Sequence, residues 1–144
     1  MDCISWLVVL HHNRRGAGVL MKKINSLEEL NIPHNYKAFI LHFLSNITSI
    51  SNVERVILFG SCAREDVNEH KSDIDLLVIT ENDVTLNEEF HIMSDCAPAY
   101  DNEYYIPSDI IVTSVGRYNQ NKDKFGMVQK QVEREGVDIS GLLR

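Results

Sequence analysis

Two short apolar runs frame a polar segment in the middle of this chain, and this arrangement most constrains its fold. Val56-Ile57-Leu58-Phe59 precedes the segment and Leu76-Leu77-Val78-Ile79 follows it. Apolar runs of this length, bounded by turn residues, are typical of strands buried on both faces. Between the runs, the segment opens with Gly60-Ser61 and closes with Asp73-Ile74-Asp75. The pattern predicts two sheet strands joined by a polar connection that carries carboxylates.

Hydrophobic periodicity and turn residues predict the other elements of one domain, a size that 144 residues fit. Helices are expected over 33–50, 61–66 (with Ser61 as its cap), 85–97 and 122–135, the last closed by Gly136, and strands over 53–59, 73–80 and 109–113. The resulting order, αβαβαβα, predicts a small α/β layer fold with an α+β mixed sheet.

The charge balance limits the classes of partner. The formal net charge is −7, while 44% of residues are hydrophobic and 24% are charged. Such a composition suits a packed domain. An acidic body argues against a protein that binds a nucleic-acid template, which needs a basic surface. We therefore expect no nucleic-acid template as a partner.

Cysteine usage and hydropathy bear on the location of the protein. Cys3, Cys62 and Cys96 are scattered and form no Cys-x-x-Cys pair, which favours a reducing cytosol over a disulfide scaffold. No apolar stretch is long enough to cross a bilayer, so we expect a cytoplasmic protein with no membrane partner.

The first twenty residues differ in pattern from the rest. They hold a short apolar segment and a glycine-bearing polar run, and the Met21-Lys22-Lys23 that follows looks like a conventional start. We expect residues 1–20 to be a dispensable extension and residues 21–144 to form the functional domain.

Three aspartates at strand starts are the candidate metal ligands. Asp73 and Asp75 are two residues apart, so they share one face of a strand. Asp109 opens the next predicted strand and joins them if the strands lie side by side. Three carboxylates can hold two Mg²⁺ ions, and Asp109 could also accept a proton from an attacking hydroxyl. The alternative is that all three are turn or cap residues that face solvent.

The start of the polar segment is the candidate phosphate site. Gly60 and Ser61 offer backbone donors at the end of a strand and the beginning of a helix, where anions bind. Arg64 lies one turn further on and is either a phosphate ligand or an exposed arginine. The sequence contains no Gly-x-x-x-x-Gly-Lys and no Gly-x-Gly-x-x-Gly, which excludes P-loop and Rossmann interpretations.

These motifs resemble the nucleotidyltransferase superfamily that includes DNA polymerase beta. More narrowly, they resemble the minimal nucleotidyltransferase (MNT) domains of antitoxin type, over most of residues 36–140. The likeness rests on five segments: Phe59-Gly60-Ser61, Ala63-Arg64, Ser72 to Val78, Asp109-Ile110-Ile111 and Val132 to Gly136. Two features depart from the pattern. The gap from Ser61 to Asp73 is one residue longer than usual, and Glu65 replaces a frequent glycine.

The resemblance implies transfer of a nucleoside monophosphate from a nucleoside triphosphate, usually ATP, to a hydroxyl. Gly60 and Ser61 would hold the triphosphate, and Asp73, Asp75 and Asp109 would bind the Mg²⁺ ions. MNT domains are typically paired with a HEPN-type toxin, so a homo- or hetero-oligomer is expected, and the acceptor would belong to that partner. The alternatives are a small-molecule nucleotidyltransferase of the aminoglycoside-modifying kind and a non-catalytic module that binds the toxin.

Overall fold

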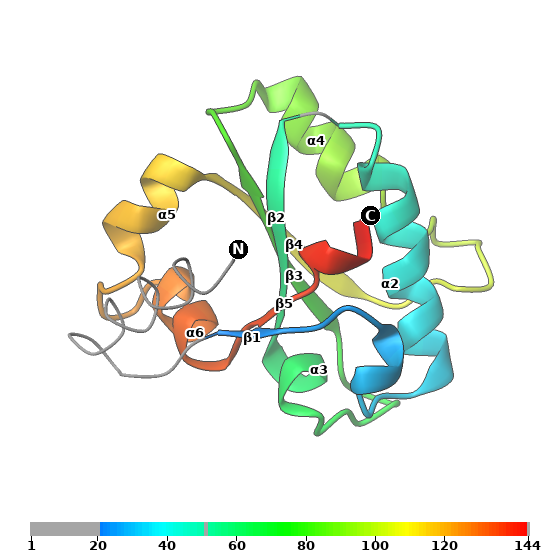
Figure 1. Ribbon diagram of the computed structural model, residues 1–144. Helices are drawn as coiled ribbons and strands as arrows, with labels where there is room; N and C mark the ends of the chain where they lie inside the picture. The colour runs from blue at the N-terminus through cyan, green and yellow to red at the C-terminus, as the bar shows by residue number, and fades with distance from the viewer. Residues whose placement is uncertain (1–20, 51, 144) are drawn as a thin grey trace.

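A five-stranded mixed sheet, with helices on both of its faces, forms the centre of the molecule (Figure 1). The computed structural model describes residues 21–50 and 52–143. The strand order is β1-β5-β2-β3-β4. The strands are β1 (Lys22–Lys23), β2 (Val53–Phe59), β3 (Ile74–Thr80), β4 (Ser108–Ser114) and β5 (Val137–Asp138). The expected extension over residues 1–20 lies outside the described residues.

Within the described residues, five α-helices and two short 3-10 helices surround the sheet. They are η1 (Leu27–Glu29), α2 (His34–Ile47), α3 (Gly60–Arg64), α4 (Leu86–Asp95), α5 (Val115–Asn121), α6 (Val128–Glu135) and η2 (Ser140–Leu143). Local chemistry accounts for several helix starts. Thr85 and Glu88 form a capping box at α4, and the Ser114 hydroxyl accepts from the Arg117 backbone at α5.

Strand pairing brings distant parts of the chain together. The central strand β2 pairs antiparallel with β3 on one side and with β5 on the other, while β3 pairs parallel with β4. The C-terminal strand β5 also pairs parallel with β1. It therefore lies inside the sheet, between the first strand and the second.

The two faces of the sheet bury different cores. Val56, Leu58, Leu76 and Val78 point into the larger core, which α2 fills with residues spaced three and four apart. Ile57, Phe59, Leu77 and Ile79 point into a smaller core with Tyr118 of α5 and Val132 of α6. In Figure 1, α2 and α4 accordingly lie on one side of the sheet and α5 and α6 on the other.

The α/β class with a mixed sheet is confirmed, and β2 and β3 follow the predicted ranges closely. The predicted helix over 122–135 is confirmed over residues 128–135 and is wrong over residues 122–127. Residues 115–121 and 128–135 form two helices, separated by a turn in which Gly126 has a φ of 82°. The expected order omitted β1 and β5, because two-residue strands have no detectable period.

No helix in the described ranges is long and apolar enough to span a membrane.

Candidate active site

Strand register places two of the three predicted carboxylates side by side. Asp75, the second residue of β3, is the direct partner of Asp109, the second residue of β4. Neighbouring strands lie about 4.8 Å apart, so both side chains leave the same face of the sheet at adjacent positions. Asp75 is also the partner of Phe59 in β2, and Gly60 follows Phe59 directly. The predicted phosphate turn and the predicted carboxylates therefore meet at one end of the sheet.

Asp75 is in an environment that opposes its negative charge. Burial raises the pKa of its carboxyl to about 6, and repulsion from Asp109, Asp73 and Glu135 adds to the shift. The nearby Arg64 guanidinium acts in the opposite direction. Carboxylates that repel one another in this way gain from a bound cation, and their oxygens are the ligands that Mg²⁺ prefers. The donor set therefore suits a divalent metal.

Asp73 lies just before β3 and is exposed, like Asp109. Across residues 21–50 and 52–143, no three His, Cys, Asp or Glu side chains are already arranged to hold one metal ion. The three aspartates thus come from the predicted elements and influence one another electrostatically, but their side chains do not converge on a common point.

Gly60 begins the short helix α3 in a conformation that favours glycine. Its φ is 72°, in the left-handed region. A Cβ atom built at Gly60 would overlap Oδ2 of Asp75 and would lie 3.0 Å from Cγ of that side chain. Glycine is therefore required at this position both by the backbone and by the approach of a site carboxylate. The helix begins one residue earlier than predicted, with Phe59 as its N-cap, so Ser61 is its second residue and not its cap.

Glu135, the last residue of α6, accepts hydrogen bonds from two of the groups that we predicted to bind phosphate. One of its oxygens, Oε2, accepts from the backbone N–H of Gly60 and from Nη1 of Arg64, both at 2.8 Å. The Glu135 side chain is 10% exposed, and Arg64 also pairs with the exposed Asp66 at 3.2 Å. The carboxylate thus holds α6 against the phosphate turn.

No site role was predicted for Glu135. Its contacts with Gly60 and Arg64 span 75 and 71 residues, and no local pattern indicates them. The available signals were its place at a helix end, directly before Gly136, and within the Val132 to Gly136 segment that resembles the family. A Cβ at Gly136 would meet the Val132 carbonyl oxygen at 2.5 Å and Cγ2 of Ile57 at 2.8 Å. That close approach of backbone to β2 fixes the position of Glu135.

The connection between Ser61 and Asp73, one residue longer than the family pattern, is well bonded. Glu65 ends α3 with a φ of 61° and a ψ of 34°, a left-handed conformation that glycine adopts at lower cost than other residues. The Tyr36 hydroxyl of α2 donates to the Ser72 carbonyl at 2.8 Å, and the Ser72 hydroxyl accepts from the Asn68 backbone at 2.8 Å. These bonds fix the backbone directly before Asp73.

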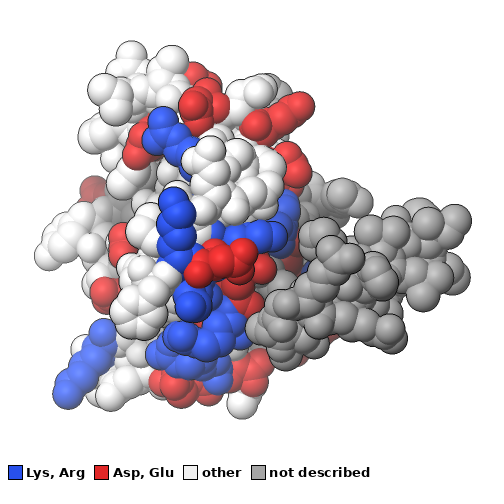
Figure 2. Space-filling model, turned by 90° about the vertical axis from the view of Figure 1, so that its left-hand side faces the viewer, with Lys and Arg blue, Asp and Glu red and all other residues white. Residues whose placement is uncertain are grey.

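Basic side chains gather on the side of the molecule that carries α5 and α6. In Figure 2, Lys and Arg residues surround a smaller group of acidic ones on this side. The segment 117–134, which includes most of α5 and all of α6 but its last residue, contains five basic residues and two acidic ones, namely Arg117, Lys122, Lys124, Lys130 and Arg134 against Asp123 and Glu133. Asp75 and Asp109 lie on the face of the sheet that α5 and α6 cover, so the candidate carboxylates and this basic segment are on the same side of the sheet.

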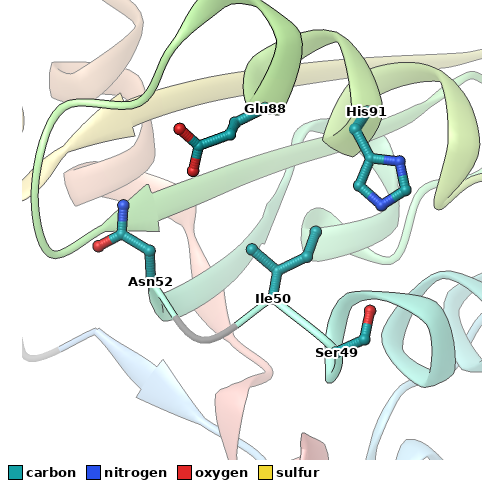
Figure 3. Close-up of a pocket in the computed structure, with 5 residues that line it drawn as sticks. All are labelled: Ser49, Ile50, Asn52, Glu88 and His91. Carbon is teal, nitrogen blue, oxygen red and sulfur yellow. The ribbon is translucent and has the colours of Figure 1, made fainter.

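A separate hollow of about 330 Å³ lies between α4 and the end of α2 (Figure 3). Ser49, Ile50, Asn52, Glu88 and His91 line it. Val53 and Thr80 pair at the end of the β2–β3 ladder, while Phe59 and Asp75 pair at the other end. The hollow is therefore at the opposite end of these strands from the carboxylates and is not part of the candidate active site.

Comparison with known proteins identifies the family. Residues 40–139 match the family model described as "Polymerase beta, Nucleotidyltransferase". The chain belongs to this nucleotidyltransferase family. The match covers Gly60, Ser61, Arg64 and all three aspartates.

Two relatives accompany this match. A protein of Methanocaldococcus jannaschii, described as a "putative protein adenylyltransferase", is 33% identical to this nucleotidyltransferase over 102 residues, which are 69% of this chain and 94% of the relative. A crystal structure from Sulfolobus solfataricus, described as a "putative nucleotidyltransferase", is 25% identical with a TM-score of 0.39. The alignment covers 64% of this chain and 84% of that one.

Proposed function

We propose that this protein transfers AMP from ATP to a hydroxyl of a partner protein, and that the partner is a HEPN-type toxin which the transfer neutralises. The observation that carries the proposal is the register pair Asp75–Asp109 beside the Gly60 turn, in a chain of the nucleotidyltransferase family. The name of the Methanocaldococcus relative supports a protein as the acceptor. An acidic net charge of −7 agrees with an acceptor other than a nucleic-acid template.

Each site residue has a role in this proposal. Gly60, Ser61 and Arg64 bind the triphosphate, with Arg64 as the cationic donor. Asp73, Asp75 and Asp109 hold Mg²⁺, two ions by the family resemblance. The metal, when bound, supplies charge neutralisation at the transferred phosphoryl group. Glu135 competes with the triphosphate for the same hydrogen-bond donors. Its carboxylate must leave Gly60 and Arg64 before the triphosphate can bind to them.

The transfer itself balances without a further reagent. The acceptor oxygen forms a bond to the α-phosphorus of ATP, and the bond from that phosphorus to the β-phosphate oxygen breaks. Pyrophosphate leaves with the electron pair. The hydroxyl proton passes to the carboxylate of Asp109, which is exposed and therefore accessible to an acceptor side chain.

The test is transfer of label from α-³²P-ATP, with Mg²⁺ or with EDTA, in the presence and absence of the protein encoded next to this one. Label on that neighbour, lost in EDTA and in Asp75→Asn, supports the proposal. Label on a small hydroxyl compound instead would replace the protein acceptor with a small molecule. If Asp75→Asn neutralised the neighbour's toxicity as well as the unmodified protein does, the antitoxin role would not depend on transfer.

A further inference from the structure

Helix α4 exposes a row of large apolar side chains, defined here as the α4 stripe: Leu86, Phe90 and Met93. Their exposed fractions are 82%, 68% and 43%. Residues four and three positions apart lie on one face of a helix, so the three side chains form one ridge about 10 Å long. Ile92 within the same helix and Cys96, its C-cap, are buried in the larger core. The stripe is therefore a second apolar face, turned away from the one that α4 buries.

An exposed row of apolar side chains indicates a surface that binds another molecule. Isolated exposed apolar residues are ordinary, but adjacent ones mark binding surfaces. Leucine, phenylalanine and methionine at i, i+4 and i+7 also match the spacing by which one helix anchors on another. The stripe thus suits a helix as its partner.

The charges around the stripe define the chemistry of that helix. Residues 81–105 contain no Lys or Arg. They hold seven acidic residues, namely Glu81, Asp83, Glu88, Glu89, Asp95, Asp101 and Glu103. Within this set, Asp83 pairs with Arg117 at 3.4 Å and Asp95 with His91 at 2.8 Å. Glu88, Glu89 and Asp95 lie on α4 itself, and Glu89, three residues after Leu86 and four before Met93, is next to the stripe. A partner that covers the stripe therefore meets acidic charge on a helix without Lys or Arg, which favours a basic partner over an acidic one.

We propose that the α4 stripe docks an amphipathic helix of another protein, whose apolar row is flanked by Lys and Arg. A second copy of this chain, stripe to stripe, would bring two identical acidic surrounds together and is disfavoured. The surface is separate from the catalytic residues, because α4 packs on the larger core while Asp75 and Asp109 face the smaller one. The proposal goes beyond nucleotidyl transfer and stands or falls by binding alone.

The test uses the full chain and two designed helical peptides of about 18 residues. Both carry Leu at alternating three- and four-residue spacing, and the flanking positions hold Lys in one peptide and Glu in the other. We expect the Lys peptide to bind, more weakly as salt rises, with backbone amide NMR shifts confined to α4 and its neighbours. We expect the Glu peptide not to bind.

A matched pair of variants makes the result specific. Phe90→Ser should weaken binding of the Lys peptide by about tenfold or more, since it removes the central apolar side chain of the stripe. Phe125→Ser makes the same change at a residue that is 94% exposed and lies beside Lys130, and it should leave binding unchanged. Leu86→Ala is a milder second variant of the stripe. Circular dichroism of all three checks that they fold.

Several outcomes would overturn the proposal. Equal binding of the Lys peptide by Phe90→Ser and by the unmodified protein would remove the stripe from the contact, as would a complete failure of that peptide to bind. Equal binding of the Glu peptide would show that charge plays no part. A concentration-dependent rise in mass that Phe90→Ser abolishes would make a second copy of this chain the occupant.

Discussion

The Cα of Gly60 lies against the carboxylate of Asp75, so that any side chain at position 60 overlaps Oδ2 of Asp75. Asp75 in turn is the register partner of Asp109. The predicted phosphate turn and the predicted metal ligand Asp75 are thus packed so closely that only glycine, which has no Cβ, fits at position 60.

Gly60→Ala should lose transferase activity and stability together. The positive φ of 72° costs roughly 1–2 kcal/mol for alanine. The collision with Asp75 also displaces a site carboxylate, so transfer of label should fall by about a hundredfold. Urea unfolding and the α-³²P-ATP assay measure the two effects.

The control for this variant is Gly126→Ala. Gly126 has a φ of 82°, but a Cβ there would meet no atom within 4 Å. It should show a similar loss of stability with activity intact. If Gly60→Ala were as active as Gly126→Ala, the close packing of Gly60 on Asp75 would not be needed for transferase activity.

Glu65→Gly should stabilise the protein. Glu65 has a left-handed backbone, which costs an ordinary residue about 1 kcal/mol relative to glycine. Its pair with Lys22 is 4.0 Å long and largely exposed, so little is lost with the side chain. Glu65→Ala loses the same pair and keeps the strain. A melting temperature that rises for glycine and not for alanine is the expected result, and equal shifts for both would contradict it.

Metal-free stability should depend on the pH through Asp75. Its pKa is about 6 in the folded protein and about 3.9 when unfolded, so the folded state holds more protons between these values. Stability should fall as pH rises from 4 to 6, with the penalty complete above 6. In EDTA, Asp75→Asn should therefore be more stable than the unmodified protein at pH 8, by about 1 kcal/mol after solvent screening.

Below pH 4 the two proteins should unfold at similar denaturant concentrations, because Asp75 is protonated in both states. Mg²⁺ should stabilise the unmodified protein at pH 8 and have a smaller effect on Asp75→Asn, if Asp75 is a metal ligand. A constant difference between the two proteins across the whole pH range would show that the carboxylate charge is not the cause.

The pair Arg64–Glu135 should be measurably coupled, while Arg64–Asp66 should not. Glu135 is largely buried and accepts two short bonds, whereas Asp66 is exposed. In a double-mutant cycle, Arg64→Ala and Glu135→Gln should couple by about 1 kcal/mol. The same cycle with Asp66→Asn should give a value within about 0.3 kcal/mol of zero. Equal couplings would mean that Glu135 is not an anchor for the phosphate turn.

Local patterns predicted the elements that carry the site, because strong apolar runs define β2 and β3 and turn residues bound them. The adjacency of Asp75 and Asp109 was a prediction that depended on strand order, and the parallel β3–β4 ladder satisfies it. Whether the three aspartates act as metal ligands stays a prediction.

The parts that sequence patterns missed depend on long-range contact. The predicted helix over 122–135 begins only at Val128, because residues 122–127 form the turn around Gly126, and a lone glycine in a polar stretch is compatible with a helix or a turn. Helix α5 was not predicted. The two-residue strand β5 exists only because β1 and β2 supply partners for its backbone. Glu135 reaches Gly60 and Arg64 for the same reason, through the docking of α6 on β2.

The position of β5 has a consequence for synthesis of the protein. Since β1 pairs with β5 and β5 with β2, the sheet cannot close on the ribosome until residues 137–138 have left the exit tunnel. Glu135 emerges at almost the same moment, so the phosphate turn gains its anchor only then. Folding of the catalytic end must therefore wait for residues 135–138, and until they emerge the nascent chain exposes the strand edge of β2 to chaperones.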